Sequence, residues 1–270
     1  MYSSVHSHTT FCDGDAAPFE MAQAAYDKGI KVFGFSAHTY DPVYDFGLKA
    51  EETETYRAEI MRVKELFDGK MQVLCGIEYD PVSGVYPMDC WDYIIGSVHG
   101  VVAKDGRYHS IDHDAPTIEN TVKNAFLSDG KAVVTAYYER LVKFHTDIKT
   151  DIVGHFDLVK KANREMPFFD ENSDWYKKTV ADAVDAVIER GRVFEVNTGA
   201  VSRGWRDDVY PSAYILKRIK EKGGRIIITA DTHAPETVDF FYKEAVDFVK
   251  SVGFTELCEL TADGFITNKI

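Results

Sequence analysis

The sequence has few basic residues for its length, and they are not clustered. Its 270 residues include 31 Lys and Arg against 44 Asp and Glu, which gives a formal net charge of −13. Proteins that bind nucleic acids or membrane surfaces normally present clustered Lys and Arg. We therefore expect neither nucleic acid nor a membrane as a partner, and any anionic substrate must be attracted by a local positive charge.

Cysteine pairs and long apolar runs are also missing. The four cysteines, Cys12, Cys75, Cys90 and Cys258, are scattered without a C-x-x-C pair. Such spacing is typical of reduced thiols, not of a disulfide framework or a zinc knuckle. No apolar run approaches the roughly 18 residues of a membrane span, and the first residues lack a charged-then-apolar signal pattern. These absences predict a cytoplasmic protein.

Features that would separate domains are absent as well. No stretch is rich in Pro, Gly or Ser in the manner of a linker, and no segment repeats. Hydrophobic residues make up 45% of the chain, enough for a sizeable core. Because a single barrel of this length is common, we predict one domain over residues 1–270.

The chain does contain apolar strands that alternate with amphipathic helices. Strands are predicted at residues 4–8, 30–38, 71–78, 93–99, 151–155, 193–197 and 225–230, with a closing strand at 256–260. Helices are predicted at 16–28, 50–67, 117–127, 133–149, 173–189, 212–222 and 238–251, and the polar segment 101–116 is expected to be a lid. Strands that are apolar throughout indicate a parallel sheet buried on both faces. About seven such units predict an α/β protein with a barrel of the β/α type.

Ionisable residues lie where the predicted strands end. His6 and His8 are two residues apart on the first strand, so their side chains point to the same face. Gly14 permits a sharp exit that can return the Asp13 carboxylate to this face, with Asp15 as the alternative. Further ionisable residues at strand ends are His38, Glu78, His99, His155, Asp231 and His233. The carboxyl ends of the strands converge on the active-site face of a β/α barrel.

Imidazoles and carboxylates that gather in one small volume need partners, because burying them unpaired is costly. A metal cluster satisfies them, and this mixture of ligands suits zinc, iron or manganese. Since no thiolate cluster is present, the pattern indicates a catalytic site instead of a structural one. His109, His113 and His145 have no strand-end position and are expected to be structural or lid residues.

The ordered set of motifs resembles the polymerase and histidinol phosphatase (PHP) family. The motifs are His6-x-His8 with Asp13-Gly14, Ser36-Ala37-His38, Gly76-Ile77-Glu78, Ser97-Val98-His99, Gly154-His155-Phe156-Asp157 and Ala230-Asp231-Thr232-His233. The resemblance implies a distorted (β/α)7 TIM-like barrel with two or three divalent ions at the carboxyl ends of its strands. It implies one ion on His6, His8, Glu78 and Asp231, a second bridged by Glu78 and held by His99 and His155, and a third on Asp13, His38 and His233.

The resemblance is to the monofunctional histidinol-phosphate phosphatases in particular, through residues 154–157 and 197–199 and Arg203. It implies that L-histidinol phosphate, a small phosphomonoester of histidine biosynthesis, is hydrolysed to L-histidinol and phosphate. A metal lowers the pKa of bound water from about 15.7 to about 7, so a metal-bridging hydroxide is expected to attack phosphorus. The expected catalytic residues are Glu78, Asp231, His233 and Arg203, with Arg203 on the phosphate. Further phosphate contacts are expected near Lys160, Lys161 and Arg164.

Alternative functions stay open at this point. Other members of the family hydrolyse nucleotides or other phosphates with the same ligands. Amidohydrolase barrels also begin with His-x-His and end with a late Asp, but Asp13-Gly14 and Glu78 fit the PHP pattern better and no position for a carbamylated lysine is evident. A non-catalytic, polymerase-associated module is disfavoured by the full ligand complement. The 15 Tyr and 17 Phe are numerous enough to cover a homo-oligomer interface.

Overall fold

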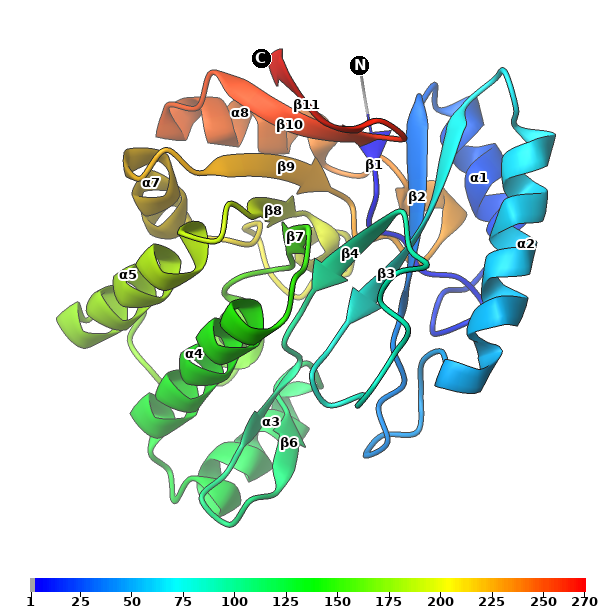
Figure 1. Ribbon diagram of the computed structural model, residues 1–270. Helices are drawn as coiled ribbons and strands as arrows, with labels where there is room; N and C mark the ends of the chain where they lie inside the picture. The colour runs from blue at the N-terminus through cyan, green and yellow to red at the C-terminus, as the bar shows by residue number, and fades with distance from the viewer. Residues whose placement is uncertain (1–2) are drawn as a thin grey trace.

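A computed structural model describes residues 3–270, in which parallel strands form a nearly closed barrel with helices outside it (Figure 1). The strands follow the order β1 (Ser3–Ser4), β2 (Val32–His38), β3 (Gln72–Tyr79), β4 (Tyr93–Gly96), β7 (Ile152–Val153), β8 (Val193–Asn197) and β9 (Arg225–Thr229). Every neighbouring pair is parallel. A parallel bridge between Ser7 and Thr232 joins the segment after β9 to the segment after β1. The predicted α/β barrel of seven strands is confirmed.

Six longer helices belong to the described residues, and Figure 1 shows these helices outside the strands. They are α1 (Pro18–Asp27), α2 (Thr53–Leu66), α4 (Gly130–Asp147), α5 (Asp174–Ile188), α7 (Ala213–Glu221) and α8 (Tyr242–Val252). Shorter helical segments are η1 (Ala50–Glu52), α3 (Ala115–Asn120), η2 (Thr121–Ala125), η3 (Leu158–Arg164), α6 (Gly199–Ser202) and η4 (Pro235–Thr237). Tyr56, Ile60 and Val63 illustrate the pattern, because their spacing places them on one buried stripe of α2. Among residues 3–270, no helix is both long and apolar enough to cross a membrane.

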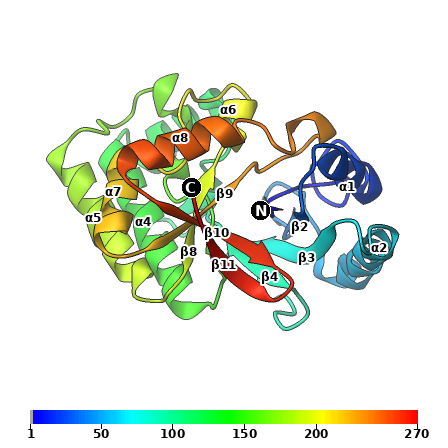
Figure 2. The same cartoon turned by 90° about the horizontal axis from the view of Figure 1, so that it is seen from above.

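A separate apolar cluster fills the interior of the barrel. Its members are Val5, Val32, Leu74, Tyr93, Ile95, Ile152, Val193, Ile227, Cys258 and Leu260. The last two belong to β10 (Glu256–Thr261), which forms an antiparallel hairpin with β11 (Gly264–Lys269). This hairpin lies across the end of the barrel that holds the N-terminus (Figure 2). The strand predicted at 256–260 therefore exists, but it caps the barrel and does not join it.

Tyr93 ties the first strand to the barrel from inside. Its hydroxyl lies 2.5 Å from the Val5 carbonyl oxygen and 3.0 Å from that of Phe35. The ring lies against Gly34 and Gly76, where an added Cβ would come within 2.5 Å of a Tyr93 atom. Glycine at these two positions makes room for the ring, which in turn holds the segment that carries His6 and His8.

The segment expected to be a polar lid has regular structure. It contains an antiparallel hairpin of β5 (Gly100–Val102) and β6 (Tyr108–Ser110). The helix predicted at 117–127 is shorter, because α3 passes into a π-helical turn at 121–125. The next helix starts at Gly130, earlier than predicted, because the Asp129 side chain accepts a hydrogen bond from the Ala132 amide (3.0 Å).

Candidate metal centre

Glu78, at the carboxyl end of β3, lies fully buried between two pairs of histidines. Its Oε2 is 3.2 Å from Nε2 of His6 and 3.6 Å from Nε2 of His8. Its Oε1 is 3.4 Å from Nε2 of His99 and 3.1 Å from Nε2 of His155. A carboxylate with a histidine pair at each oxygen can bridge two metal ions.

Asp231 completes the first of these pairs. It follows β9 with φ of 46°, a left-handed conformation that is uncommon outside glycine and clusters at functional sites. Its Oδ2 accepts hydrogen bonds from Asn197 Nδ2 (3.1 Å) and Arg203 Nη2 (3.0 Å). Its Oδ1 faces His8 Nε2 (3.2 Å) and His6 Nε2 (3.6 Å). The two donors thus orient the carboxylate so that one oxygen faces the histidines.

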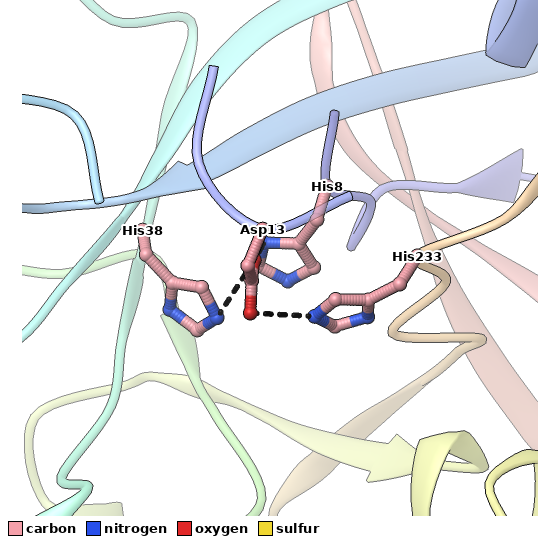
Figure 3. Close-up of side chains that lie close together, drawn as sticks. All are labelled: His8, Asp13, His38 and His233. Atoms are coloured by element: carbon pink, nitrogen blue, oxygen red, sulfur yellow. Dashed lines mark ion pairs between the residues drawn. The ribbon is translucent and has the colours of Figure 1, made fainter. Parts of the chain in front are cut away.

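A third group surrounds Asp13, as Figure 3 shows. Asp13 Oδ1 lies 3.7 Å from His38 Nε2 and from His8 Nδ1, and Oδ2 lies 3.3 Å from His233 Nε2. The ring of His8 stacks against those of His38 (4.2 Å between centroids) and His233 (4.1 Å). Gly14 permits this turn by close approach, because a Cβ there would collide with the backbone of His8. Asp13 therefore lies beside His8, His38 and His233.

His8 lies next to both the group around Asp13 and the group with His6 and Asp231, but it can be a metal ligand in only one of them. A neutral imidazole has one lone pair and one N–H. Its Nε2 faces Glu78 and Asp231, whereas its Nδ1 lies 3.5 Å from Cys12 Sγ. The geometry favours Nε2 as the ligand atom and Nδ1 as the donor.

Burial and neighbouring charges shift the pKa values of the clustered histidines in opposite directions. Burial, with His233 and His38 alongside, lowers the pKa of His8 to about 3, so His8 is neutral at pH 7. Burial also acts to lower the pKa of His6, but Glu195 and Glu78 outweigh it and raise that pKa well above its ordinary value. His99 behaves like His6, because Glu78 and Asp80 raise its pKa. A metal ion would compete with protons at His6 and His99 but not at His8.

Unpaired buried nitrogens test whether the cluster fits a metal. Nε2 of His6, His8 and His99 are buried and have no hydrogen-bond partner among residues 3–270. Leaving a buried polar atom unsatisfied costs about 1–3 kcal/mol, so native structures rarely do it. All three nitrogens face Glu78. Imidazole and carboxylate ligands suit zinc, iron or manganese. The residues therefore fit a metal cluster.

Glu195 is a buried carboxylate that the sequence analysis missed. It lies on β8 and accepts hydrogen bonds from His6 Nδ1, the His155 amide (2.7 Å) and Thr229 Oγ1 (2.6 Å). The first bond leaves Nε2 of His6 to face Glu78, and such carboxylate partners orient metal-binding histidines. A charged residue inside the apolar strand Val193–Asn197 was the available signal.

Asp80 orients His99 in the same way. Its Oδ2 accepts from the backbone amide of His99 (2.7 Å) and from Nδ1 (3.1 Å). Asp80 was missed although it follows Glu78 by two residues, a spacing that places both side chains on one face of a strand.

A cavity of about 490 Å³ lies over the cluster. Six proposed ligands line it, namely Asp13, His38, His99, His155, Asp231 and His233. Arg203 and Lys161 line it too, and both lie against the ring of Trp205, at 4.5 and 3.2 Å from its centroid. Lys161 Nζ also donates to Asp112 Oδ1 (2.5 Å), in the segment expected to be a lid. Arg203 and Lys161 share this lining with carboxylates, including Asp112, Asp114 and Glu165, so a net positive charge in the cavity requires the metal ions.

Other predicted residues lie elsewhere. Lys160 is buried against Asp157 (3.1 Å), and Arg164 pairs with Asp207 (2.7 Å), so neither lines the cavity. Asp15 is exposed and lies outside the three groups. His145 is buried in α4 and bonds Thr150, His109 lies on β6, and the exposed His113 lines the cavity. None of these three histidines belongs to a ligand group.

Comparison with known proteins places this geometry in context. The sequence profile of the PHP domain matches residues 4–199. A probable histidinol-phosphatase of Deinococcus radiodurans is 29% identical and covers 92% of each chain. The histidinol-phosphatase of Bacillus subtilis is 24% identical over 88% of this chain and 96% of that one. A Lactococcus lactis structure, described as histidinol phosphate phosphatase complexed with zinc, L-histidinol and phosphate, matches with a TM-score of 0.71 at 18% identity and covers 98% of both chains.

Proposed function

The chain belongs to the PHP domain family, and from that membership we propose that it is a metal-dependent phosphomonoesterase that hydrolyses L-histidinol phosphate to L-histidinol and phosphate. The observation that carries the proposal is the buried cluster of unpaired imidazole nitrogens around Glu78, beneath a cavity with basic residues on its wall. Likeness to histidinol-phosphatases along almost the whole chain supports the substrate.

Nine residues would hold two or three divalent ions of zinc, manganese or iron. One set is His6, His8, Glu78 and Asp231, the second is Glu78 with His99 and His155, and the third is Asp13, His38 and His233. The contact between His38 Nδ1 and Glu78 Oε2 (2.8 Å) supports His38 in the third set, because it leaves Nε2 to face Asp13 (3.7 Å).

When bound, the ions supply an activated water at neutral pH and positive charge for the phosphoryl oxygens. The side chains of the protein would hold the ions in place and orient their ligands. Glu78 would join the first two sets and Asp231 would complete the first, while Glu195 and Asp80 would keep His6 and His99 in the required tautomers.

Arg203 would bind the phosphate. Its Nη1 lies 2.6 Å from His233 Nδ1, and since arginine only donates, that nitrogen accepts. If His233 uses Nε2 as a ligand, its proton moves to Nδ1 and Arg203 must turn to another acceptor. The cavity that Arg203 lines offers the phosphate as that acceptor, and a guanidinium matches phosphate in a bidentate geometry.

Proton delivery to the leaving alkoxide would fall to Asp231 or His233. Both are among the nine proposed ligands, and both line the cavity. Asp231 Oδ2 already accepts from Asn197 and Arg203, so a proton on this carboxylate would compete with two donors. His233 is therefore the better of the two candidates.

The experiment that tests the substrate is phosphate release from L-histidinol phosphate beside a panel of nucleotides and sugar phosphates, with metal added. The proposal predicts a kcat/KM for L-histidinol phosphate at least about tenfold above any other member of the panel, equivalent to about 1.4 kcal/mol of discrimination. Equal or better turnover of a nucleotide would retain the phosphatase and refute the substrate. An amidohydrolase would cleave amides and no member of the panel.

A further inference from the structure

The side chain of Tyr210 combines deep burial with an unpaired hydroxyl. The residue is 2% exposed, yet it lines the cavity over the cluster. Its Oη has no hydrogen-bond partner within the described part of the chain. Buried tyrosine hydroxyls usually find a partner, and phenylalanine would fill the same space without an unpaired polar atom. The hydroxyl therefore needs an explanation other than packing.

The backbone holds Tyr210 firmly beside the cluster. The Asn197 amide donates to the Tyr210 carbonyl (2.7 Å), and the Tyr210 amide donates to the Asn197 carbonyl (3.0 Å) at the carboxyl end of β8. The tyrosine ring lies edge-on to the ring of His155, with 6.4 Å between centroids. Lys160 Nζ lies over the Tyr210 ring, 5.4 Å from its centroid. A donor on this ring has little freedom to seek a partner elsewhere.

Two other donors line the same cavity, and both already have protein partners. Arg203 donates to Asp231 (3.0 Å), and Lys161 donates to Asp112 (2.5 Å). A tyrosine hydroxyl, with an ordinary pKa of about 10, carries its proton at neutral pH and can donate. The three groups together favour an anion with several acceptor oxygens as the ligand.

We infer that Tyr210 is a further substrate-binding residue, whose hydroxyl donates a hydrogen bond to a phosphoryl oxygen of the monoester bound over the cluster. The inference rests on the proposed function, because it takes the phosphate to lie beside His155. Inorganic phosphate, the reaction product, presents the same oxygens and serves as the probe.

The test is Tyr210→Phe, which removes the hydroxyl and keeps the ring. Calorimetric titration of the metal-loaded enzyme with inorganic phosphate should show roughly tenfold weaker binding, the loss expected for a hydrogen bond to a charged group. Metal content should not change. Phosphate affinity within twofold of the wild type, at equal metal content, would overturn the inference.

Tyr138→Phe is the matched control, because Tyr138 is equally buried but its hydroxyl contacts Tyr176 (3.5 Å) and it does not line the cavity. Its phosphate affinity should equal that of the wild type. Thermal unfolding separates binding from structure: phosphate should raise the midpoint of Tyr210→Phe less than that of the wild type. An equal rise in both would overturn the inference. If the wild type binds phosphate but fails to hydrolyse L-histidinol phosphate, the proposed substrate fails while a tenfold loss in Tyr210→Phe still supports the phosphate contact.

Discussion

At the residue scale, function depends on which nitrogen of each imidazole carries the proton. His6 and His99 each have one nitrogen on a buried carboxylate, Glu195 and Asp80 respectively. The other nitrogen of each faces Glu78. Because a neutral imidazole has one N–H, the buried carboxylates fix which nitrogen is available as a ligand.

Replacing Glu195 tests this role. Glu195→Gln keeps the size of the side chain but replaces one acceptor oxygen with an amide group that only donates. His6 and Thr229 donate to Oε1, whereas the His155 amide and Asn197 donate to Oε2, so in either orientation the glutamine leaves one pair of donors without its acceptor. We expect metal affinity to fall roughly 10- to 100-fold, the usual effect of losing such a partner. Competition with a chromogenic chelator measures it.

Glu259→Gln is the control for that measurement. Glu259 is also buried, but it lies on β10 and accepts from Asn268 (2.6 Å), away from the cluster. Its metal affinity should match that of the wild type. A Glu195→Gln protein with unchanged affinity would show that the carboxylate does not orient His6.

Arg203 provides a second prediction at this scale. Arg203→Ala removes a guanidinium proposed to bind phosphate but none of the nine proposed metal ligands. We expect KM for L-histidinol phosphate to rise by about tenfold or more, as for the loss of a charge-assisted hydrogen bond. Steady-state kinetics with metal analysis on the same sample checks this, and an unaltered KM would refute the phosphate contact.

Some residues of the site could be predicted from the sequence and others could not. His38 and Glu78 lie at the carboxyl ends of β2 and β3, and His6 follows β1, so their position relative to apolar strands was enough to predict them as candidates. Glu195 lies inside a strand, and Tyr210 lies in a loop that a backbone bridge brings to β8. The role of Glu195 depends on its hydrogen bond with His6, which is 189 residues away in the sequence, and local spacing does not encode such a contact.

At the element scale, the barrel strands were predicted well because each is a short apolar run followed by a polar residue. β8 matches its predicted range, and β2 and β3 differ only near their ends. The first strand is the exception: it was predicted at 4–8, but β1 covers only Ser3–Ser4, and beyond it Ser7 pairs with Thr232 through an isolated bridge. Of the hairpin β10–β11 only the first strand was predicted, and the hairpin in the lid segment was not predicted at all. Both depend on antiparallel pairing of short, partly exposed strands, for which the sequence offers no long apolar run.

The substitution Gly76→Ala tests how β3 and β4 position the first strand. Gly76→Ala would place a Cβ 2.5 Å from atoms of the Tyr93 ring. Overpacking of this kind typically costs about 1–3 kcal/mol of unfolding free energy. Urea denaturation should show this loss in the wild-type background and a smaller loss beside Tyr93→Leu. An equal loss in both backgrounds would mean that Tyr93 is not the obstacle.

At the scale of the whole molecule, an acidic protein is proposed to bind an anionic substrate. The net charge of −13 would repel a phosphomonoester from most of the surface. Divalent ions in the cluster, with Arg203 and Lys161 on the cavity wall, would reverse the sign locally. One domain over residues 1–270 and a homo-oligomer stay predictions.

Metal binding should stabilise the protein more at higher pH. The raised pKa values of His6 and His99 mean that these residues hold protons where an ordinary histidine has lost them, and a metal must displace those protons. Without metal, the stability that these protonated histidines contribute is present at low pH and lost as pH rises through the raised pKa values. With metal, affinity increases over the same range.

Thermal unfolding with and without a chelator measures this effect. At a metal concentration about 1,000 times Kd, binding adds roughly 4 kcal/mol to the free energy of unfolding, which raises Tm by about 10 °C for a chain of this size. The shift should be larger at pH 8 than at pH 6. A shift that is equal at both values, or larger at pH 6, would contradict the assignment of protons to His6 and His99.

The most direct test of the account as a whole is a zinc titration of chelator-stripped protein in which bound metal and phosphate release from L-histidinol phosphate are measured on the same samples. The account predicts no release without metal, release that rises with bound zinc until two or three ions are held, and loss of both in His8→Ala. Full activity in the stripped protein, or full activity and metal binding in His8→Ala, would contradict it.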